Sequence, residues 1–325
     1  MGTATLSAFS DQFVIAATVL YVVAMVGFAV EVATWSRVPQ GVVSVPVGSL
    51  FSVHAGGEDR TTAAPATQGG VPGGSRTARG AAHAALLLTA AGWVLHAGSI
   101  VARGLAAGRA PWGNMYEFSS AICLSAVTVF LLLQWGRPSR RLGLFVLLPV
   151  VLGLGVATMV LYTPVGPLVP ALHSYWLVIH VAAAITASGL FTVASALAAV
   201  YLAVTGRGTG RVRSARRTVV PDPDNLDDLC FRLLAIAFPI WTFAVVAGAI
   251  WAESAWGRYW GWDPKETWAF IIWVVYAAYL HARVTAGWRG RRAAVLALVG
   301  AAAFVFNYFG VNLWVSGLHS YAGVR

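Results

Sequence analysis

The chain has 325 residues, of which 58% are hydrophobic and only 10% are charged. Globular domains carry roughly a quarter of their residues as charges, so this composition excludes an ordinary soluble domain and indicates a protein of the lipid bilayer. The net charge of +10 would also suit a nucleic-acid-binding protein, but the placement of the basic residues along the chain argues against that class.

Eight apolar stretches are long enough to cross a membrane, because a hydrocarbon core about 30 Å thick needs ~20 residues per helix. The first stretch has no basic run before it and no cleavage site of small residues after it, which favours a retained span over a signal peptide. We therefore expect an all-α, polytopic membrane protein with helices near residues 12–35, 81–103, 116–135, 142–162, 174–205, 231–252, 267–285 and 293–312.

Basic residues are divided unequally between the segments that connect these spans. One side of the membrane receives 17 of the 22 Lys and Arg residues, and the other side receives only Arg103, Arg109, Arg258, Lys265 and Arg325. Cytoplasmic segments are enriched in Lys and Arg, so both termini are predicted to lie outside. The positive charge thus sets orientation, and no nucleic-acid partner is expected.

The connecting segments suggest a simple division of the chain. Residues 1–36 hold the first span, and residues 37–80, rich in Gly, Ala, Thr and Pro and containing His54, are predicted to be a flexible cytoplasmic loop. Residues 81–325 form the remaining membrane domain, with a second cytoplasmic connection at 206–230 that is expected to be solvated rather than a docking surface. Cys123 and Cys230 form no CxxC motif and are expected to be inert packing residues.

The most informative segment is WGRYWGWDPKETW at residues 256–268. Asp263 can cap the seventh span, and Glu266 follows three residues later, which is a capping-box arrangement with Pro264 in the first turn. A belt of interfacial aromatic residues would account for one or two tryptophans, but not for four tryptophans and a tyrosine. Flat indole faces beside a bilayer suit a large, planar, apolar ligand.

Histidines near a membrane are costly and indicate function unless they bond a neighbouring helix. His180 lies about 9 Å into the fifth span at 1.5 Å per residue, and His319 follows the eighth span, so both approach the surface that carries the tryptophans. His281 lies about 21 Å along the seventh span, near the opposite leaflet. Two imidazoles from different helices suit a bis-histidine iron porphyrin, with satisfied structural histidines as the alternative. His83, His96 and His173 are weaker candidates.

The tryptophan segment resembles the "WWD" signature of haem-handling proteins. Three flanking segments resemble the CcsA/ResC branch of cytochrome c biogenesis proteins (System II): SYWLVIH at 174–180, YLHAR at 279–283 and GVNLWVSGLHSY at 310–321. PWGNMYE at 111–117 is similar to the Asn-x-Tyr-Glu element of that family. The resemblance covers most of residues 90–325, and eight spans together with Asp-Pro-Lys-Glu favour this branch over the shorter and longer relatives of the other assembly system.

The resemblance implies a set of haem-binding residues. His180 and His319 would be external haem ligands, His281 a transmembrane ligand, and residues 256–268 a shelf that holds haem. In that family the second transmembrane ligand belongs to a CcsB/ResB-type partner subunit, and this chain offers no evident substitute unless His96 serves. The shelf residues so implied are Trp256, Tyr259, Trp260, Trp262, Asp263 and Trp268.

The function so implied is transport of haem b, bound as a substrate, across the cytoplasmic membrane. Haem would be presented on the extracytoplasmic face to apocytochrome c with a CxxCH motif, for thioether formation by a holocytochrome c synthetase (haem lyase). Arg258 and Lys265 are outward cations that would pair with haem propionates or snorkel to the interface. Two alternatives remain open, a transmembrane electron carrier with fixed b-type haems and a solute transporter.

Overall fold

The computed structural model describes residues 2–35, 76–136, 140–167, 172–206 and 222–319, and every regular element in these residues is a helix. Eight helices are long and apolar enough to span a membrane, which confirms the predicted all-α, multi-pass architecture. In chain order the helices are α1 (Thr3–Trp35), α2 (Arg76–Ala107), α3 (Met115–Leu133), α4 (Leu142–Met159), α5 (Tyr175–Thr205), α7 (Pro223–Trp256), α8 (Pro264–Val284), α9 (Arg291–Val305), the π-helical turn Phe306–Gly310 and α10 (Val311–Trp314).

Three helices begin well before the predicted spans, and the first of them, α1, starts at Thr3 rather than near residue 12. Helix α2 already starts at Arg76, so the last residues of the predicted loop 37–80 are helical, whereas the greater part of that loop, with His54, lies outside the described residues. Helix α7 starts at Pro223, within the predicted connection 206–230. The Asp222 side chain caps it by accepting a hydrogen bond from Asp224 N at 3.2 Å, so this acidic stretch is the polar first turns of a long helix.

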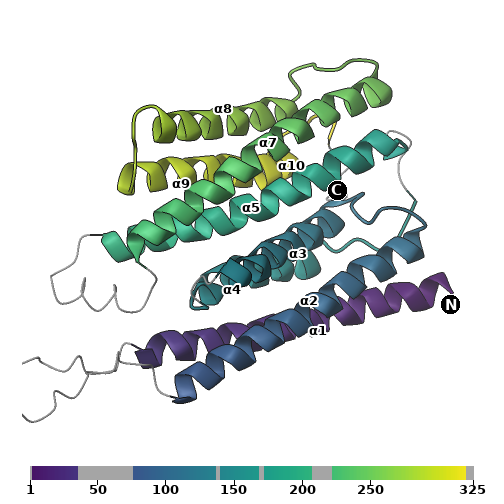
Figure 1. Cartoon of the computed structure of the whole chain (residues 1–325). Helices are drawn as coiled ribbons and strands as arrows, with labels where there is room; N and C mark the ends of the chain where they lie inside the picture. The colour runs from purple at the N-terminus through teal and green to yellow at the C-terminus, as the bar shows by residue number, and fades with distance from the viewer. Residues whose placement is uncertain (1, 36–75, 137–139, 168–171, 207–221, 320–325) are drawn as a thin grey trace, which may run out of the picture.

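The helices cross the molecule in alternating directions, and their ends gather at two opposite faces (Figure 1). We call the face where α7 ends at Trp256 and α8 begins at Pro264 the aromatic end. The face where α8 ends at Val284 and α9 begins at Arg291 is the charged end. Between them α1 and α2 form one layer, α3 and α4 the next, then α5 with α7, and α8 with α9 lie at the far side (Figure 1).

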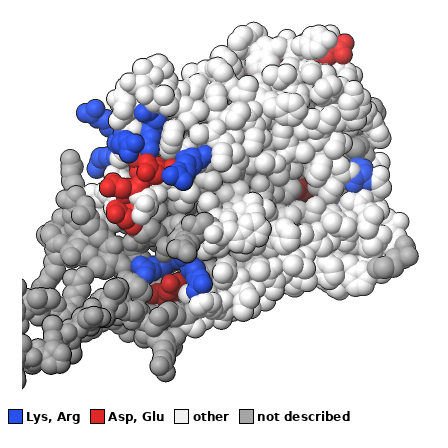
Figure 2. Space-filling model, in the orientation of Figure 1, with Lys and Arg blue, Asp and Glu red and all other residues white. Residues whose placement is uncertain are grey.

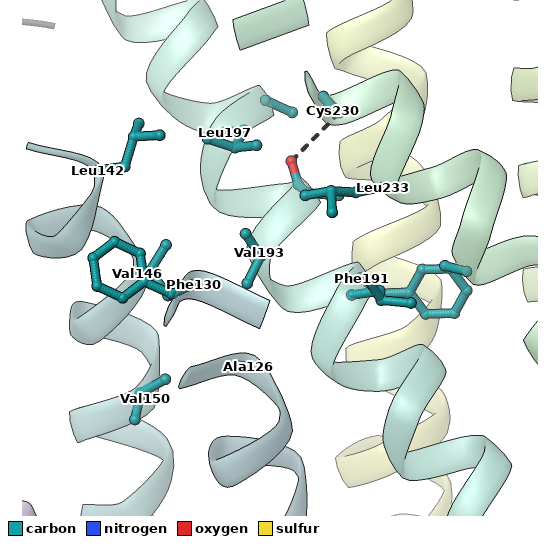
Figure 3. Packing of buried hydrophobic residues seen from close by; sticks show 14 of the residues in the cluster. Ala126, Phe130, Leu142, Val146, Val150, Phe191, Val193, Leu197, Cys230 and Leu233 are labelled. Atoms are coloured by element: carbon teal, nitrogen blue, oxygen red, sulfur yellow. Dashed lines mark hydrogen bonds between the residues drawn. The ribbon is translucent and has the colours of Figure 1, made fainter. Parts of the chain in front are cut away.

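The core is built where α5 contacts α3, α4, α7 and α9, and buried aliphatic and aromatic side chains interlock there (Figure 3). Small residues allow helices in lipid to approach closely, because van der Waals packing rather than hydrophobicity drives their association. Cys230 Sγ donates to Ala194 O at 3.4 Å, and Cys123 Sγ to Val150 O at 3.6 Å. Both cysteines are free and buried, as expected of packing residues.

Ion pairs lie at both ends of the bundle, while the face shown in Figure 2 is mostly uncharged between the two ends. Arg283 of α8 is buried and pairs with Asp227 of α7 at 2.5 Å and with Asp228 at 3.4 Å. Arg141 lies 3.8 Å from Glu31, which joins α4 to the end of α1. The charged end therefore ties neighbouring helices together, whereas the aromatic end carries the chemistry described next.

Candidate functional site

The connection between α7 and α8 is held by its own capping groups. Gly257 follows the last residue of α7 and terminates the helix, with a φ of 71°, a left-handed value that favours glycine. Asp263 and Glu266 form the capping box that the sequence predicts: Asp263 caps α8, and Glu266 Oε2 accepts from Asp263 N at 3.0 Å. Trp262 also has a positive φ, 58°, which is rare for a residue with a Cβ and marks a strongly constrained turn.

Asp263 also contacts His319, 56 residues further along the chain. Its Oδ1 lies 2.9 Å from His319 Nδ1, and its Oδ2 accepts from Leu318 N at 2.7 Å. Burial alone would raise the pKa of the Asp263 carboxyl, but the hydrogen bonds from the His319 side chain and the Leu318 amide outweigh burial and lower it to about 2. The ionised carboxylate fixes the His319 tautomer with the proton on Nδ1, which places the lone pair on Nε2.

His180 is oriented by the backbone of α7. Its Nδ1 lies 2.7 Å from Ala244 O, and a carbonyl can only accept, so Nδ1 carries the proton and Nε2 the lone pair. The ring lies against Gly248, where a Cβ would come within 2.7 Å of Nδ1. Glycine at this position is therefore what allows the imidazole of α5 to reach the α7 carbonyl.

Trp251 of α7 joins the two imidazoles. Its ring stacks on His180 at a centroid distance of 6.0 Å and an angle of 12°, and it meets His319 edge-on at 5.8 Å. Trp256 contacts Trp251 at 4.9 Å and His319 at 5.0 Å. The two histidines thus meet on one wall of aromatic rings at the aromatic end.

Two cavities lie beside this wall. Cavity A, about 170 Å³, is bordered by Trp112, Asn114 and Asn312, and cavity B, about 70 Å³, by Trp256, Tyr259 and Trp260. Both are mainly apolar, as is usual for sites that hold large ligands. The residues that line both cavities are His180, Trp241, Trp251, Lys265, Ala269 and His319.

A larger cavity of about 590 Å³ lies within the membrane-spanning parts of α3, α4, α5 and α9. We call it the membrane cavity. Its lining is almost entirely apolar and includes no histidine. It shares Phe304 and Tyr308 with cavity A, and these two rings stack at 6.5 Å. The chemistry-bearing residues therefore belong to cavities A and B.

Comparisons with known proteins assign the chain to a family. A family model described as Cytochrome C assembly protein matches residues 112–319, from the border of cavity A to His319. The "Cytochrome c biogenesis protein CcsA" of Gloeobacter violaceus is 35% identical over 277 residues, which cover 69% of this chain and 82% of that protein. This chain belongs to the CcsA family of cytochrome c biogenesis proteins. The CcsA of Gloeothece citriformis is 37% identical over 268 residues, covering 68% and 81%.

A solved structure supports the fold. The "Cytochrome c Heme Lyase CcmF" superposes with a TM-score of 0.63 at 15% sequence identity. The alignment covers 95% of this chain but 47% of CcmF, so this chain spans about half the length of that protein. The helical arrangement of this chain is thus shared with a protein of very different sequence.

The predicted shelf residues take up different positions. Trp256, Tyr259 and Trp260 border cavity B, and Asp263 supports His319 from behind. Trp262 is 66% exposed and contacts Trp260 and Phe270. Trp268 packs on Phe306 at 4.3 Å and borders neither cavity. In the part of the chain that is described, the structure therefore brings three of the five predicted aromatic residues to the cavities.

The other histidines lie away from this site. His281 is exposed on α8 near the charged end, and its Nδ1 lies 3.4 Å from Thr285 Oγ1. His96 is fully buried on α2, between Tyr21 OH at 3.4 Å and Ser120 Oγ at 3.0 Å. Helices α2 and α8 belong to opposite outer layers, so His96 does not supply a second ligand beside His281 (Figure 1). His83 contacts Arg140, and His173 is exposed.

Four residues that line both cavities were not predicted from the sequence in their observed roles: Trp241, Trp251, Lys265 and Ala269. Trp241 and Trp251 lie within an apolar helix, where a tryptophan has the sequence signature of an ordinary core residue. Lys265 was expected to point outward, but its Nζ donates to Asn307 O at 3.1 Å and it lines both cavities. A lysine in the first turn of a helix snorkels only if its stem lies along the surface. Here the stem instead leads the Nζ to the backbone of the π-helical turn.

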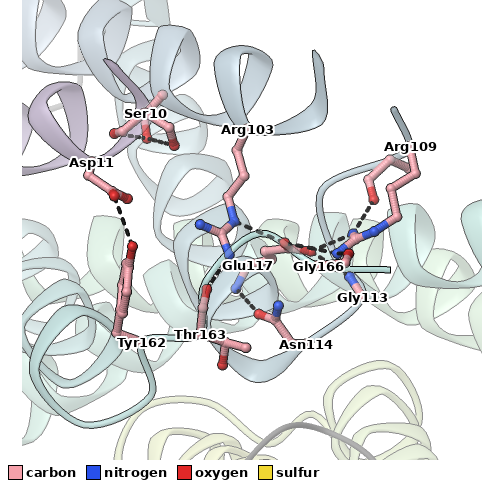
Figure 4. A network of polar contacts seen from close by, with 12 residues as sticks. Ser10, Asp11, Arg103, Arg109, Gly113, Asn114, Glu117, Tyr162, Thr163 and Gly166 are labelled. Atoms are coloured by element: carbon pink, nitrogen blue, oxygen red, sulfur yellow. Dashed lines mark hydrogen bonds and ion pairs between the residues drawn. The ribbon is translucent and has the colours of Figure 1, made fainter. Parts of the chain in front are cut away.

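The loop that borders cavity A is held by buried charges (Figure 4). The Glu117 carboxylate accepts hydrogen bonds from Arg103 Nε at 2.9 Å, from Arg109 Nη1 at 2.8 Å and from Gly113 N at 2.8 Å. Arg103 also donates to Thr163 O. Asn114 caps α3 by accepting from Glu117 N at 2.9 Å. The Asn-x-Tyr-Glu element thus fixes the wall of cavity A through backbone and charge contacts.

Proposed function

We propose that this chain binds haem b at the aromatic end between His180 and His319 and presents it to apocytochrome c for covalent attachment at a CxxCH motif. The observation that carries the proposal is that two imidazoles from distant parts of the chain line the same two cavities, against one wall of tryptophans. Bis-histidine ligation of haem iron requires two such imidazoles. The name of the CcsA relatives, cytochrome c biogenesis, agrees with this chemistry.

The chain's own groups prepare both histidines as ligands. Ala244 O holds the proton of His180 on Nδ1, and the Asp263 carboxylate does the same for His319. A carboxylate or carbonyl behind an imidazole fixes the tautomer and raises the basicity of the ligating nitrogen. Haem supplies the iron and the vinyl groups, while the protein binds, orients and shields them.

Binding requires movement at the aromatic end. Neither cavity reaches the roughly 300 to 1,000 Å³ that is usual for ligand pockets. Six residues line both cavities, among them Trp251 and Lys265. We infer that these side chains move apart when haem enters, which merges cavities A and B into one site.

The inner part of the proposal concerns His281 and a partner. His281 is exposed on α8, and its surroundings on this chain include no second imidazole among the described residues. An exposed histidine within a membrane span suits a ligand pair completed by another subunit. We propose that a CcsB/ResB-type protein supplies that ligand, that His281 lies near the cytoplasmic side, and that the aromatic end faces outward from the cytoplasmic membrane.

Two other functions fit the site less well. An electron carrier with two fixed haems would need a pair of histidines near the aromatic end and a second pair near His281. His96, the other histidine inside the bundle, already contacts Tyr21 and Ser120. A solute transporter would use acidic residues or broken helices near the bilayer midplane. The buried acid Glu117 lies in the first turn of α3, where Arg103 and Arg109 neutralise it.

The direct test is reconstitution of the purified chain with haem b. We expect the absorption spectrum of a low-spin, six-coordinate haem in the unaltered protein, and a loss of that spectrum in both His180→Ala and His319→Ala. His173→Ala serves as the control, since His173 is exposed and outside the cavities. Unchanged spectra in both site variants would contradict the proposal.

A further inference from the structure

Lys265 is placed where a charged group is unusual. It lies in the first turn of α8 and is directed into the bundle, where its Nζ donates to Asn307 O at 3.1 Å and lies 5.7 Å from the centre of the Tyr308 ring. It borders both cavity A and cavity B together with His180 and His319. In the described part of the chain, it is the only lysine or arginine that borders either cavity.

Lys265 differs from the other cations near the aromatic end in its lack of a carboxylate partner. Arg103 and Arg109 each pair with Glu117, and Arg258 lies 3.6 Å from Glu266. No carboxylate of the described residues forms an ion pair with Lys265 Nζ within 4.0 Å. A cation removed from water is costly unless an anion accompanies it. The cavities therefore favour a ligand that carries negative charge near Lys265.

Asp263 attracts the Lys265 ammonium group through space but forms no ion pair with it, and both adjacent acids already accept other hydrogen bonds. Asp263 accepts from Lys265 N, the backbone amide, and from His319, so it serves the helix cap and the histidine. Glu266 accepts from Gly261 N at 2.8 Å and from Asp263 N. A carboxylate on the ligand would instead form a charge-assisted hydrogen bond with the ammonium group.

We infer that Lys265 binds a propionate carboxylate of haem, and that Arg258 does not. This inference rests on the proposed function and adds a determinant of orientation. Two axial imidazoles fix the iron but leave the porphyrin free to rotate about the axis through them. A cation at one side selects the carboxylate-bearing edge and thereby directs the vinyl groups, which lie away from that edge, to a defined position for the incoming thiols.

The test separates the carboxylates from the rest of the ligand by using two probes, haem b and haem b dimethyl ester, in which both carboxylates are esterified. Each probe is titrated into the purified full-length chain, into Lys265→Met and into Lys265→Arg, with absorption spectra recorded. Arg258→Gln is the matched control, because Arg258 is a nearby cation that already has a carboxylate partner.

In the unaltered chain, haem b should bind about ten- to a hundredfold more tightly than the ester, as expected for one charge-assisted hydrogen bond. Lys265→Met should lose that preference by weakening haem b alone, with the ester still giving the low-spin spectrum. Lys265→Arg should keep most of the preference, and Arg258→Gln should keep all of it.

Two results would overturn the inference. Equal weakening of haem b and of the ester by Lys265→Met would mean that Lys265 acts through Asn307 and Tyr308 on the shape of the cavities. An ester that binds the unaltered chain as tightly as haem b would exclude a carboxylate contact. Both results differ from a failure of the proposed function, in which neither probe would give a bis-imidazole spectrum in the unaltered chain.

Discussion

Asp263 Oδ1 lies 2.9 Å from His319 Nδ1 while the same side chain caps α8, so one carboxylate couples the start of a membrane helix to a histidine 56 residues away. The cap fixes the position of the carboxylate, and the carboxylate fixes the ring. The orientation of the imidazole therefore depends on the helix beginning at this residue.

Asp263→Asn should separate these two roles. Asparagine is a good helix cap, so the thermal stability of the protein should change little. Its neutral amide cannot hold the His319 proton as strongly, and we expect the affinity for haem b to fall about ten- to a hundredfold, the usual effect of losing such a supporting contact. Asp222→Asn, which alters the cap of α7 at the charged end, is the control. An unchanged haem affinity in Asp263→Asn would refute the orienting role.

Gly248→Ala should displace His180. The new Cβ would come within 2.7 Å of Nδ1 and would force the imidazole away from Ala244 O. We expect a stability cost of about 1–3 kcal/mol from overpacking, and a haem spectrum that shifts towards five-coordinate iron. Gly155→Ala on α4 meets no atom within 4 Å and should leave the spectrum as it was. A normal six-coordinate spectrum in Gly248→Ala would show that the close approach is dispensable.

Glu117→Gln should destabilise the wall of cavity A. The substitution leaves Arg103 and Arg109 without their shared carboxylate in a buried place, and breaking a buried ion pair costs about 3–5 kcal/mol. The measurement is chemical denaturation in detergent. Glu31→Gln, which removes a 3.8 Å contact at the charged end, should cost less than about 1 kcal/mol. Equal losses of unfolding free energy in Glu117→Gln and Glu31→Gln would contradict a special role of Glu117 in the stability of the protein.

His281→Ala should lower the haem content of the complex purified with the proposed CcsB/ResB-type partner, while the protein still accumulates in the membrane. The reason is that His281 is exposed on a membrane helix near the charged end, remote from cavities A and B. His83→Ala provides a histidine control at the same end, outside the family motifs. Undiminished haem with normal cytochrome c maturation would assign His281 a packing role.

The fold was largely predictable because each span is a long apolar stretch, and all eight are present. The errors lie at Thr3, Arg76 and Pro223, where helices begin several residues before the predicted apolar stretch and hydropathy gives no boundary. The capping box of Asp263 and Glu266 was predicted from three-residue spacing alone and is confirmed.

The site was less predictable, since its parts depend on how helices face one another. Spacing placed His180 and His319 near one surface, but the link through Trp251 requires knowing which side of α7 faces α5. For the same reason the sequence could not tell that Trp268 packs on Phe306 or that Lys265 points inward.

The most direct test of the central claim replaces each proposed ligand by glycine and supplies free imidazole. His180→Gly and His319→Gly leave space where the ring was, and imidazole at millimolar concentration can ligate iron there without restoring a covalent link. We expect each variant to accumulate in the membrane but to lose cytochrome c maturation, and added imidazole to recover part of the activity and the low-spin spectrum. His173→Gly should behave like the unaltered protein. Normal maturation by both site variants without imidazole would contradict ligation by His180 and His319.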